Sequence, residues 1–276
     1  MRQNTEVLMR RLSFRTYSQR GFTLVEMIVV LVIVGILAAL GGMFITKPIE
    51  GYLDLSRRAT LADAADNALR RMQRDIRQAL PNSVRITPNG RCLELLHTVD
   101  GGRYRARGTA ADDILDFTQA DNSFDVLGSL SDPPTPGHAL VVYNLTATGN
   151  AGNAYLANFR RTVTGGNATS VQFAPDTRFP FASPFQRFFL VDGPVSYVFN
   201  QGAGTLERHS GYPIAAAQNA SPTNSPAIMA RHVTSCNFYY NPGTPERSGL
   251  VTLRLTLAEE GETITLLHQV HVENAP

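Results

Sequence analysis

A glycine, an aromatic residue and a carboxylate stand close together where a long apolar segment begins. Gly21 precedes Phe22, and Thr23 and Glu26 are the only polar side chains in residues 22–45. A helix of this length measures about 36 Å at roughly 1.5 Å per residue, enough to cross a hydrocarbon core of about 30 Å. A charge inside such a core costs on the order of 3 kcal/mol, and less near a helix end. Glu26 is therefore expected to be functional or paired.

The residues before this segment are basic. Residues 1–21 contain five arginines and one glutamate, whereas the whole chain has a net charge of +2. The remainder therefore carries a net charge of about −2, which suggests no polyanionic partner. The positive-inside rule predicts that residues 1–21 lie in the cytoplasm and that the chain after residue 45 lies outside it. Both Met1 and Met9 could be the start of this leader.

The position of the glycine excludes an ordinary secretory signal, which is cleaved after its apolar core at small residues. Gly21 to Glu26, with the apolar run that follows, resembles the class III signal of type IV prepilins and type II secretion pseudopilins. The resemblance implies cleavage between Gly21 and Phe22 and methylation of the new amino group of Phe22. It also implies that Thr23, Leu24 and Glu26 act in peptidase recognition and assembly. Glu26 would then lie one helical turn from the Phe22 amine, or pair with the amine of a neighbouring subunit.

The same resemblance implies the partners and the location of the chain. The partners are the prepilin peptidase and methylase, other minor and major pilins bound through the N-terminal helix, and an inner-membrane assembly platform. The chain would cross the inner membrane once, with its leader in the cytoplasm and its C-terminal domain in the periplasm, and could enter a pilus or pseudopilus. No cofactor, catalytic residue or nucleic-acid partner is implied.

Further stretches are similar to particular minor pilins. Residues 193–197 and 204–208 resemble the strand pair of J-type and PilW-like minor pilins. Segments within residues 49–85 resemble the MshO-type minor pilin of the mannose-sensitive haemagglutinin (MSHA) pilus. These likenesses favour a minor pilin that acts in assembly or initiation of an MSHA-like type IV pilus. A J-type minor pseudopilin of type II secretion, a membrane-anchored periplasmic adhesin or enzyme, and a plain single-pass anchor are the alternatives.

The two cysteines, Cys92 and Cys236, both lie in the exported part of the chain. Because that compartment is oxidising, the sequence predicts a disulfide between them. It would close a loop of about 145 residues and contribute nominally about 4–5 kcal/mol. Two separate buried thiols are the alternative. A zinc site is not predicted, because two lone cysteines lack the Cys-x-x-Cys spacing.

Three carboxylates, Asp112, Asp113 and Asp116, are a calcium hypothesis, because hard cations bind several carboxylate oxygens. They do not follow an EF-hand pattern, so a solvated acidic turn is the preferred interpretation.

Two other groups of residues were candidates for binding. A basic aromatic run could contact nucleic acid, but four residues are too few to predict such a site. His268 and His271 lie three apart on a predicted strand, so they point to opposite faces and cannot chelate together. The basic aromatic run consists of Arg103, Tyr104, Arg105 and Arg107.

One long helix followed by a sheet would position these residues. Gly41, Gly42 and Pro48 predict a bend or a melted turn near residues 41–48. From residue 50 to residue 80, apolar residues recur at spacings of four and three, which predicts an amphipathic helix that Pro81 ends. The apolar stripe comprises Leu61, Ala65, Leu69, Met72, Ile76 and Leu80.

After Pro81 the pattern changes to short segments of period two between turn residues, which predicts an antiparallel sheet and an α+β fold. Strands are expected at 91–98, 139–144, 158–163, 170–173, 187–191, 195–200 and 232–240, followed by a hairpin over 251–270. Residues 100–137, 145–156 and 209–229 are expected to be loop-rich, the last as a mobile excursion. The predicted organisation is a leader (1–21), a transmembrane and filament-core helix (22–45), an amphipathic helix (46–81) and a β-rich periplasmic domain (82–276).

Overall fold

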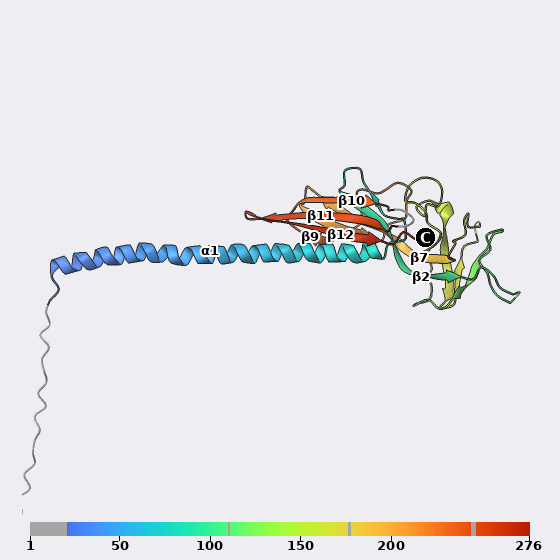
Figure 1. The fold of residues 1–276 in the computed structure, drawn as a ribbon, viewed down its shortest axis with the longest axis horizontal. Coiled ribbons are helices and arrows are strands. Elements are labelled where there is room, and N and C mark those ends of the chain that lie inside the picture. The colour runs from blue at the N-terminus through green and yellow to red at the C-terminus, as the bar shows by residue number, and fades with distance from the viewer. Residues whose placement is uncertain (1–20, 110, 176–177, 244–246) are drawn as a thin grey trace, which may run out of the picture. The chain divides into compact units, whose positions relative to one another are not determined.

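The computed structural model describes residues 21–109, 111–175, 178–243 and 247–276. The chain forms two compact units, Met1–Leu53 and Asp54–Pro276. A single helix, α1 (Leu24–Arg77), begins in the first unit and ends in the second (Figure 1). Of the two alternatives predicted near residues 41–48, a bend or a melted turn, the melted turn is not present, because α1 continues through Pro48. A proline removes only one backbone hydrogen bond, and a long helix keeps the others.

All strand pairings are antiparallel, so the predicted α+β, pilin-like class is confirmed. The larger sheet has the order β1-β2-β3-β6-β5-β4-β7-β8-β9, with β2 also paired to β7, and the smaller has the order β10-β11-β12. The strands of the larger sheet are β1 (Arg85–Ile86), β2 (Cys92–Tyr104), β3 (Ser123–Leu127), β4 (Ala139–Val142), β5 (Arg160–Asn167), β6 (Ser170–Phe173), β7 (Arg187–Asn200), β8 (Thr205–Ser210) and β9 (Ala227–Ala230). Those of the smaller sheet are β10 (Val233–Asn241), β11 (Gly249–Glu259) and β12 (Glu262–Val272), and a 3-10 turn spans Ala157–Phe159.

The observed strands differ from the prediction mainly in length. The two strands expected at 187–191 and 195–200 form one strand, β7, which continues through Pro194 beside a register shift in β2. The region expected to be loop-rich at 100–137 contains the end of β2 and all of β3. In each case pairing with a distant strand extends the element beyond what its own residues indicate.

The second part of α1 packs on the sheets. Its apolar stripe is buried as the spacing predicts, from Leu61 at 3% exposure to Ile76 at 0%. The stripe forms one core with residues of β2, β7 and β8 and of the smaller sheet. Helix α1 ends at Arg77, earlier than Pro81, and Leu80 packs in a separate cluster with Leu96 and Val141.

One buried charge joins α1 to the larger sheet. Asp75 is only 4% exposed and accepts a hydrogen bond of 2.8 Å from the Tyr197 hydroxyl and one of 2.7 Å from Nε of Arg208. Burying a carboxylate is costly unless it is paired and hydrogen-bonded, and here both partners come from neighbouring strands. Asp75 therefore helps to fix the position of this part of α1 on β7 and β8.

Residues 211–226, here called the strap, connect β8 to β9. The sequence suggests a mobile excursion, but the strap is held down. The Arg85 guanidinium donates hydrogen bonds of 2.7–3.2 Å to the backbone oxygens of residues 215–217. It also pairs with Glu94 at 2.9 Å and lies 3.5 Å from the ring centroid of Tyr155. The local composition could not show this anchoring, because Arg85 is distant in the sequence.

Candidate functional site

The residues of the predicted signal lie just before α1 and in its first turn. Residues 21–23 lie outside the helix, and the hydroxyl of Thr23 accepts a hydrogen bond of 3.2 Å from the backbone N–H of Glu26. Thr-x-x-Glu is the spacing of a capping box, in which the threonine satisfies a free N–H of the first turn. Glu26 also places its negative charge where the helix dipole favours an anion. Thr23 is thus the N-cap of α1, a role that the spacing indicates but that the sequence analysis did not assign.

The helix that follows is apolar on all sides. Leu24–Gly41 is long and apolar enough to cross a membrane, and none of it is buried within the chain. It is the one such helix among the described residues. Phe22 is 80% exposed, and the described side chains of residues 24–40 are also exposed. An apolar surface of this size requires a bilayer or other helices to cover it.

The fold does not require the glycine at position 21. Its backbone is not in the left-handed region, and a Cβ added there would meet nothing within 4 Å. Among the described residues, the Glu26 carboxylate also has no ion-pair partner within the chain. The two residues that define the signal are therefore not explained by contacts inside the described structure, as is expected when other proteins recognise them.

The predicted disulfide is not formed, because Cys92 and Cys236 are both free and buried. They face different surroundings: Cys236 belongs to the core beneath α1, whereas the Cys92 sulfur lies 3.7 Å from Nε2 of Gln218 and 3.9 Å from the carbonyl oxygen of Asn219 in the strap. Burial raises the pKa of the Cys92 thiol to about 11 and that of Cys236 to about 12. Both thiols are therefore protonated at neutral pH and are poor nucleophiles.

The three carboxylates of the calcium hypothesis bond to different groups. Asp112 accepts hydrogen bonds from the backbone and side chain of Thr109, and Asp116 accepts the corresponding bonds from Thr118. These bonds hold the pKa values of both carboxyls below their usual range. The backbone N–H of Asp113 instead donates a hydrogen bond to the carboxylate of Asp125 on β3. The described part of the chain contains no group of three or more His, Cys, Asp or Glu residues able to hold a metal.

The basic aromatic run does not form a continuous surface. Tyr104 is 1% exposed, and its hydroxyl donates to the backbone oxygen of Ser183, so its ring cannot stack on a base. Arg105 lies 3.5 Å from carboxylates of both Asp112 and Asp125. Arg103 and Tyr104 end β2 and point to opposite faces of it, whereas Arg105 and Arg107 lie after the strand. Arg103 and Arg107 remain exposed.

The two histidines on β12 behave as the strand pattern predicts. His268 is partly buried, whereas His271 is exposed, so the side chains lie on opposite faces of the smaller sheet. The two histidines therefore cannot bind the same metal ion.

Comparison with known proteins gives one match. The prokaryotic N-terminal methylation motif matches residues 17–42, which include Gly21, the first turn of α1 and most of its apolar part. Comparison with curated proteins and with solved structures gives no match. The motif and the single apolar helix fit a single-pass protein of the inner membrane, and they indicate a type IV pilin or pseudopilin that the prepilin peptidase processes.

Proposed function

We propose that the chain is a minor pilin that acts in the assembly or initiation of an MSHA-like type IV pilus. One observation carries the proposal: the part of α1 that bears the methylation motif is apolar and wholly uncovered by its own chain. In the inner membrane the lipid would cover it. After extraction from the membrane, the helices of neighbouring pilins would replace the lipid, so the helix itself would be the assembly element.

Processing would act on the residues just before the helix. The peptide bond between Gly21 and Phe22 lies outside α1, so its cleavage would break no helical hydrogen bond. Cleavage would leave a positively charged amine on Phe22, and methylation would keep that charge. Thr23 would continue to cap the helix, so that the mature chain begins with a rigid first turn.

Glu26 would supply the polar contact of the assembled helices. A carboxylate in an apolar helix is costly unless it is paired. After cleavage the Phe22 amine would lie one turn away, and a neighbouring subunit would offer a second amine of the same kind. The attraction between carboxylate and amine strengthens in the low dielectric of a helix bundle, so it favours the assembled state.

The decisive experiment on Glu26 is the substitution Glu26→Gln, which keeps the size of the side chain and removes its charge. We expect mature, methylated protein in normal amount and at least tenfold fewer filaments. Glu50→Gln is the matched control, because Glu50 is also exposed on α1 but lies after the apolar part. Normal filament numbers with Glu26→Gln would refute the role proposed for the charge.

The same signal equally supports a J-type minor pseudopilin of type II secretion. A strain that lacks the protein separates these two functions. Loss of surface filaments with normal secretion would support the pilus, and loss of secreted proteins with normal filaments would support the secretion system. Intact mass and N-terminal sequence of the envelope protein test the step that both share. A chain that keeps its leader would instead support a plain single-pass anchor or a membrane-anchored adhesin or enzyme.

A further inference from the structure

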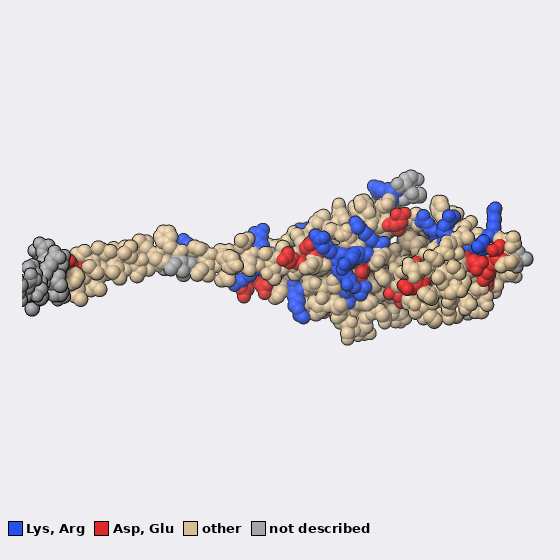
Figure 2. All heavy atoms as spheres, turned by 90° about the horizontal axis from the view of Figure 1, so that it is seen from below, with Lys and Arg blue, Asp and Glu red and all other residues tan. Residues whose placement is uncertain are grey.

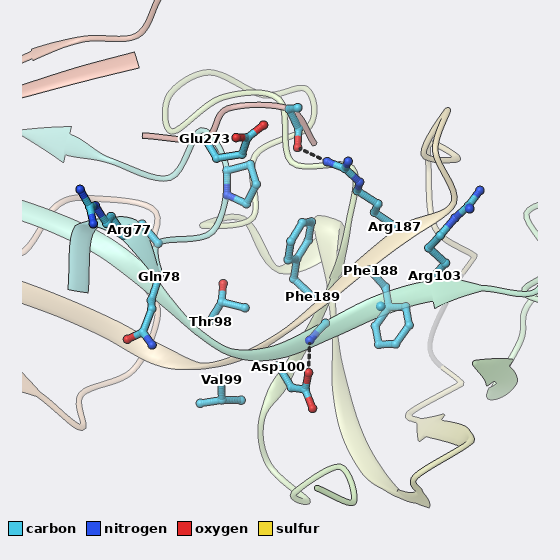
Figure 3. Close-up of a pocket in the computed structure, with 15 residues that line it drawn as sticks. Arg77, Gln78, Thr98, Val99, Asp100, Arg103, Arg187, Phe188, Phe189 and Glu273 are labelled. Carbon is cyan, nitrogen blue, oxygen red and sulfur yellow. Dashed lines mark hydrogen bonds between the residues drawn. The ribbon is translucent and has the colours of Figure 1, made fainter. Parts of the chain in front are cut away.

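A groove of about 560 Å³ lies in the second unit, where α1 ends beside β2 and β7 (Figure 3). Three arginines from three different elements line it: Arg77 from α1, Arg103 from β2 and Arg187 from β7. We propose that this arginine groove binds an acidic, extended segment of a neighbouring subunit. The nature of that neighbour rests on the proposed function, whereas the binding of an acidic segment does not.

Within the described part of the chain, no carboxylate forms an ion pair with any of the three arginines of the groove. Arg103 donates through Nε to the backbone oxygen of Phe185 at 3.1 Å, and Arg187 donates to that of Ala275 at 3.2 Å. These bonds orient the guanidinium groups and leave their charge in place. A planar guanidinium with free donors matches a carboxylate in a two-bond arrangement.

The two carboxylates that line the groove offset part of this charge, and three arginines against two carboxylates leave an excess of one positive charge. Asp100 accepts hydrogen bonds from the backbone N–H groups of Gly101 at 2.7 Å and Ser131 at 2.8 Å, which fix its oxygens. Glu273 is exposed and makes no ion pair within the described residues. In Figure 3 it lies at the rim of the groove, on the side where Arg187 bonds the C-terminal backbone.

The floor of the groove suits a peptide. Val99 is 45% exposed and Phe189 is half-buried, so the ligand would cover apolar surface as well as charge. The hydroxyl of Thr98 is buried at the groove and has no hydrogen-bond partner, which leaves one polar group for the ligand to satisfy. A flat bilayer surface cannot enter a groove to reach Thr98, and a small inorganic anion would leave the apolar floor uncovered.

The basic surface continues along α1. Arg70, Arg74 and Arg77 lie at spacings of four and three, and therefore on one side of the helix, with Arg71 beside them. Arg70 is paired with Asp66, whereas Arg74 and Arg77 have no ion pair among the described residues. Figure 2, which views residues 54–276 from the α1 side, shows basic side chains gathered near the middle of this unit. An acidic segment that approaches along this side would be guided towards the groove.

Peptide binding to the full-length protein in a non-ionic detergent tests the proposal. The probe is a fluorescent hexapeptide of alternating glutamate and valine, and its matched control replaces glutamate by glutamine. Fluorescence anisotropy at low salt should show binding of the acidic probe at least tenfold tighter than that of the control. Equal affinities, or no binding, would overturn the proposal.

Substitutions of residues that line the groove test whether the acidic peptide binds there. The double substitution Arg77→Gln with Arg103→Gln should weaken binding of the acidic probe at least tenfold. Arg254→Gln is the control, because Arg254 is exposed on β11, outside the groove, and should change the affinity less than twofold. Thr98→Val should weaken binding as well, by a fewfold, although it removes no charge. An equal loss in the Arg254 variant would show that diffuse charge attracts the probe, and would refute the groove as the site.

Three further outcomes test the lipid alternative and keep this inference separate from the proposed function. Vesicles with and without anionic phosphatidylglycerol test the lipid alternative: if they bind with the same arginine dependence while the peptide does not, the groove binds lipid headgroups and the proposal is wrong. If the chain is processed and forms filaments but does not bind the acidic peptide, only the groove inference falls. If the peptide binds but the leader is never removed, the proposed function falls and the groove remains.

Discussion

Both the first part of α1 (Leu24–Gly41) and its second part (Leu61–Ile76) carry apolar side chains, but only those of the second part are buried within the chain. In Leu24–Gly41 no part of the helix is buried inside the chain, whereas the stripe from Leu61 to Ile76 is covered by strands of both sheets. The second part is amphipathic, because only one side of it meets the sheet. The first is apolar all round, because every side of it must meet lipid or another helix. The difference shows which part stabilises the domain and which part is available to partners outside it.

The carboxylates of the two parts differ in the same way. Asp75 has partners in its own chain, Tyr197 and Arg208, at hydrogen-bond distance. Glu26 has no ion-pair partner among the described residues. A carboxylate in an apolar setting needs a counter-charge. The counter-charge of Asp75 comes from its own chain, whereas the counter-charge of Glu26 would come from the proposed filament.

The largest effect is expected at the start of the first part. Gly21→Leu should abolish processing, because the fold tolerates a side chain there while the peptidase would not. Intact mass should show a precursor that keeps its leader and carries no methyl group. Gly51→Ala is the control, since a Cβ there also meets nothing within 4 Å. A correctly processed Gly21→Leu protein would contradict the proposed cleavage site.

A pair of identical substitutions compares the two parts directly. Ile76→Ala should lower the free energy of unfolding by about 2–5 kcal/mol, because Ile76 is fully buried and truncation leaves a cavity. Ile33→Ala should leave that free energy unchanged, because Ile33 is 49% exposed and belongs to none of the buried clusters formed by the described residues. Denaturant unfolding of the detergent-solubilised protein measures both. Equal effects would show that the apolar part also stabilises the domain.

Removal of the buried charge of the second part should lower the free energy of unfolding by less than the largest loss expected for Ile76→Ala. Asp75→Ala leaves the Tyr197 hydroxyl and the Arg208 guanidinium without their partner, and should cost on the order of 3 kcal/mol. Asp66→Ala is the matched control on the same helix, because its pair with Arg70 is exposed and contributes little. The same unfolding experiment distinguishes them. A loss in the Asp66 variant as large as that of Asp75→Ala would argue against the role assigned to burial.

The smallest expected effect lies just beyond the end of α1. His97 on β2 bonds Asp192 at 3.0 Å and lies 3.4 Å from Gln78. The hydrogen bond that the His97 ring donates to the Asp192 carboxylate raises the pKa of His97. A raised folded-state pKa means that the protonated histidine stabilises the fold below about pH 6.5, its usual pKa, and that this contribution is lost as the pH rises through the folded-state pKa.

Solvent screens this pair, so its contribution should not exceed about 1 kcal/mol. Stability measured between pH 5 and 9 should therefore fall slightly across this window in the native protein, and Asp192→Asn should flatten the curve. His271→Gln is the control, because His271 is exposed on β12. An unchanged pH profile in Asp192→Asn would refute the contribution of the pair.

The sequence by itself determined the features that depend on neighbouring residues. The motif around Gly21 and Glu26, the apolar run, the buried stripe from Leu61 to Ile76 and the final hairpin all follow from local spacing. The α+β class followed from the change of period after Pro81. Such patterns can be read directly because each helix turn or strand pair is formed by residues a few positions apart.

Only the tertiary structure decided the features that need distant residues to meet. It left Cys92 and Cys236 as free thiols with different neighbours, paired Asp75 with β7 and β8, and joined two predicted strands into β7. It anchored the strap on Arg85 and brought Arg77, Arg103 and Arg187 to one groove. These arrangements depend on strand order and register. A shift of one residue would turn every side chain of a strand to the other face, so local composition could not specify them.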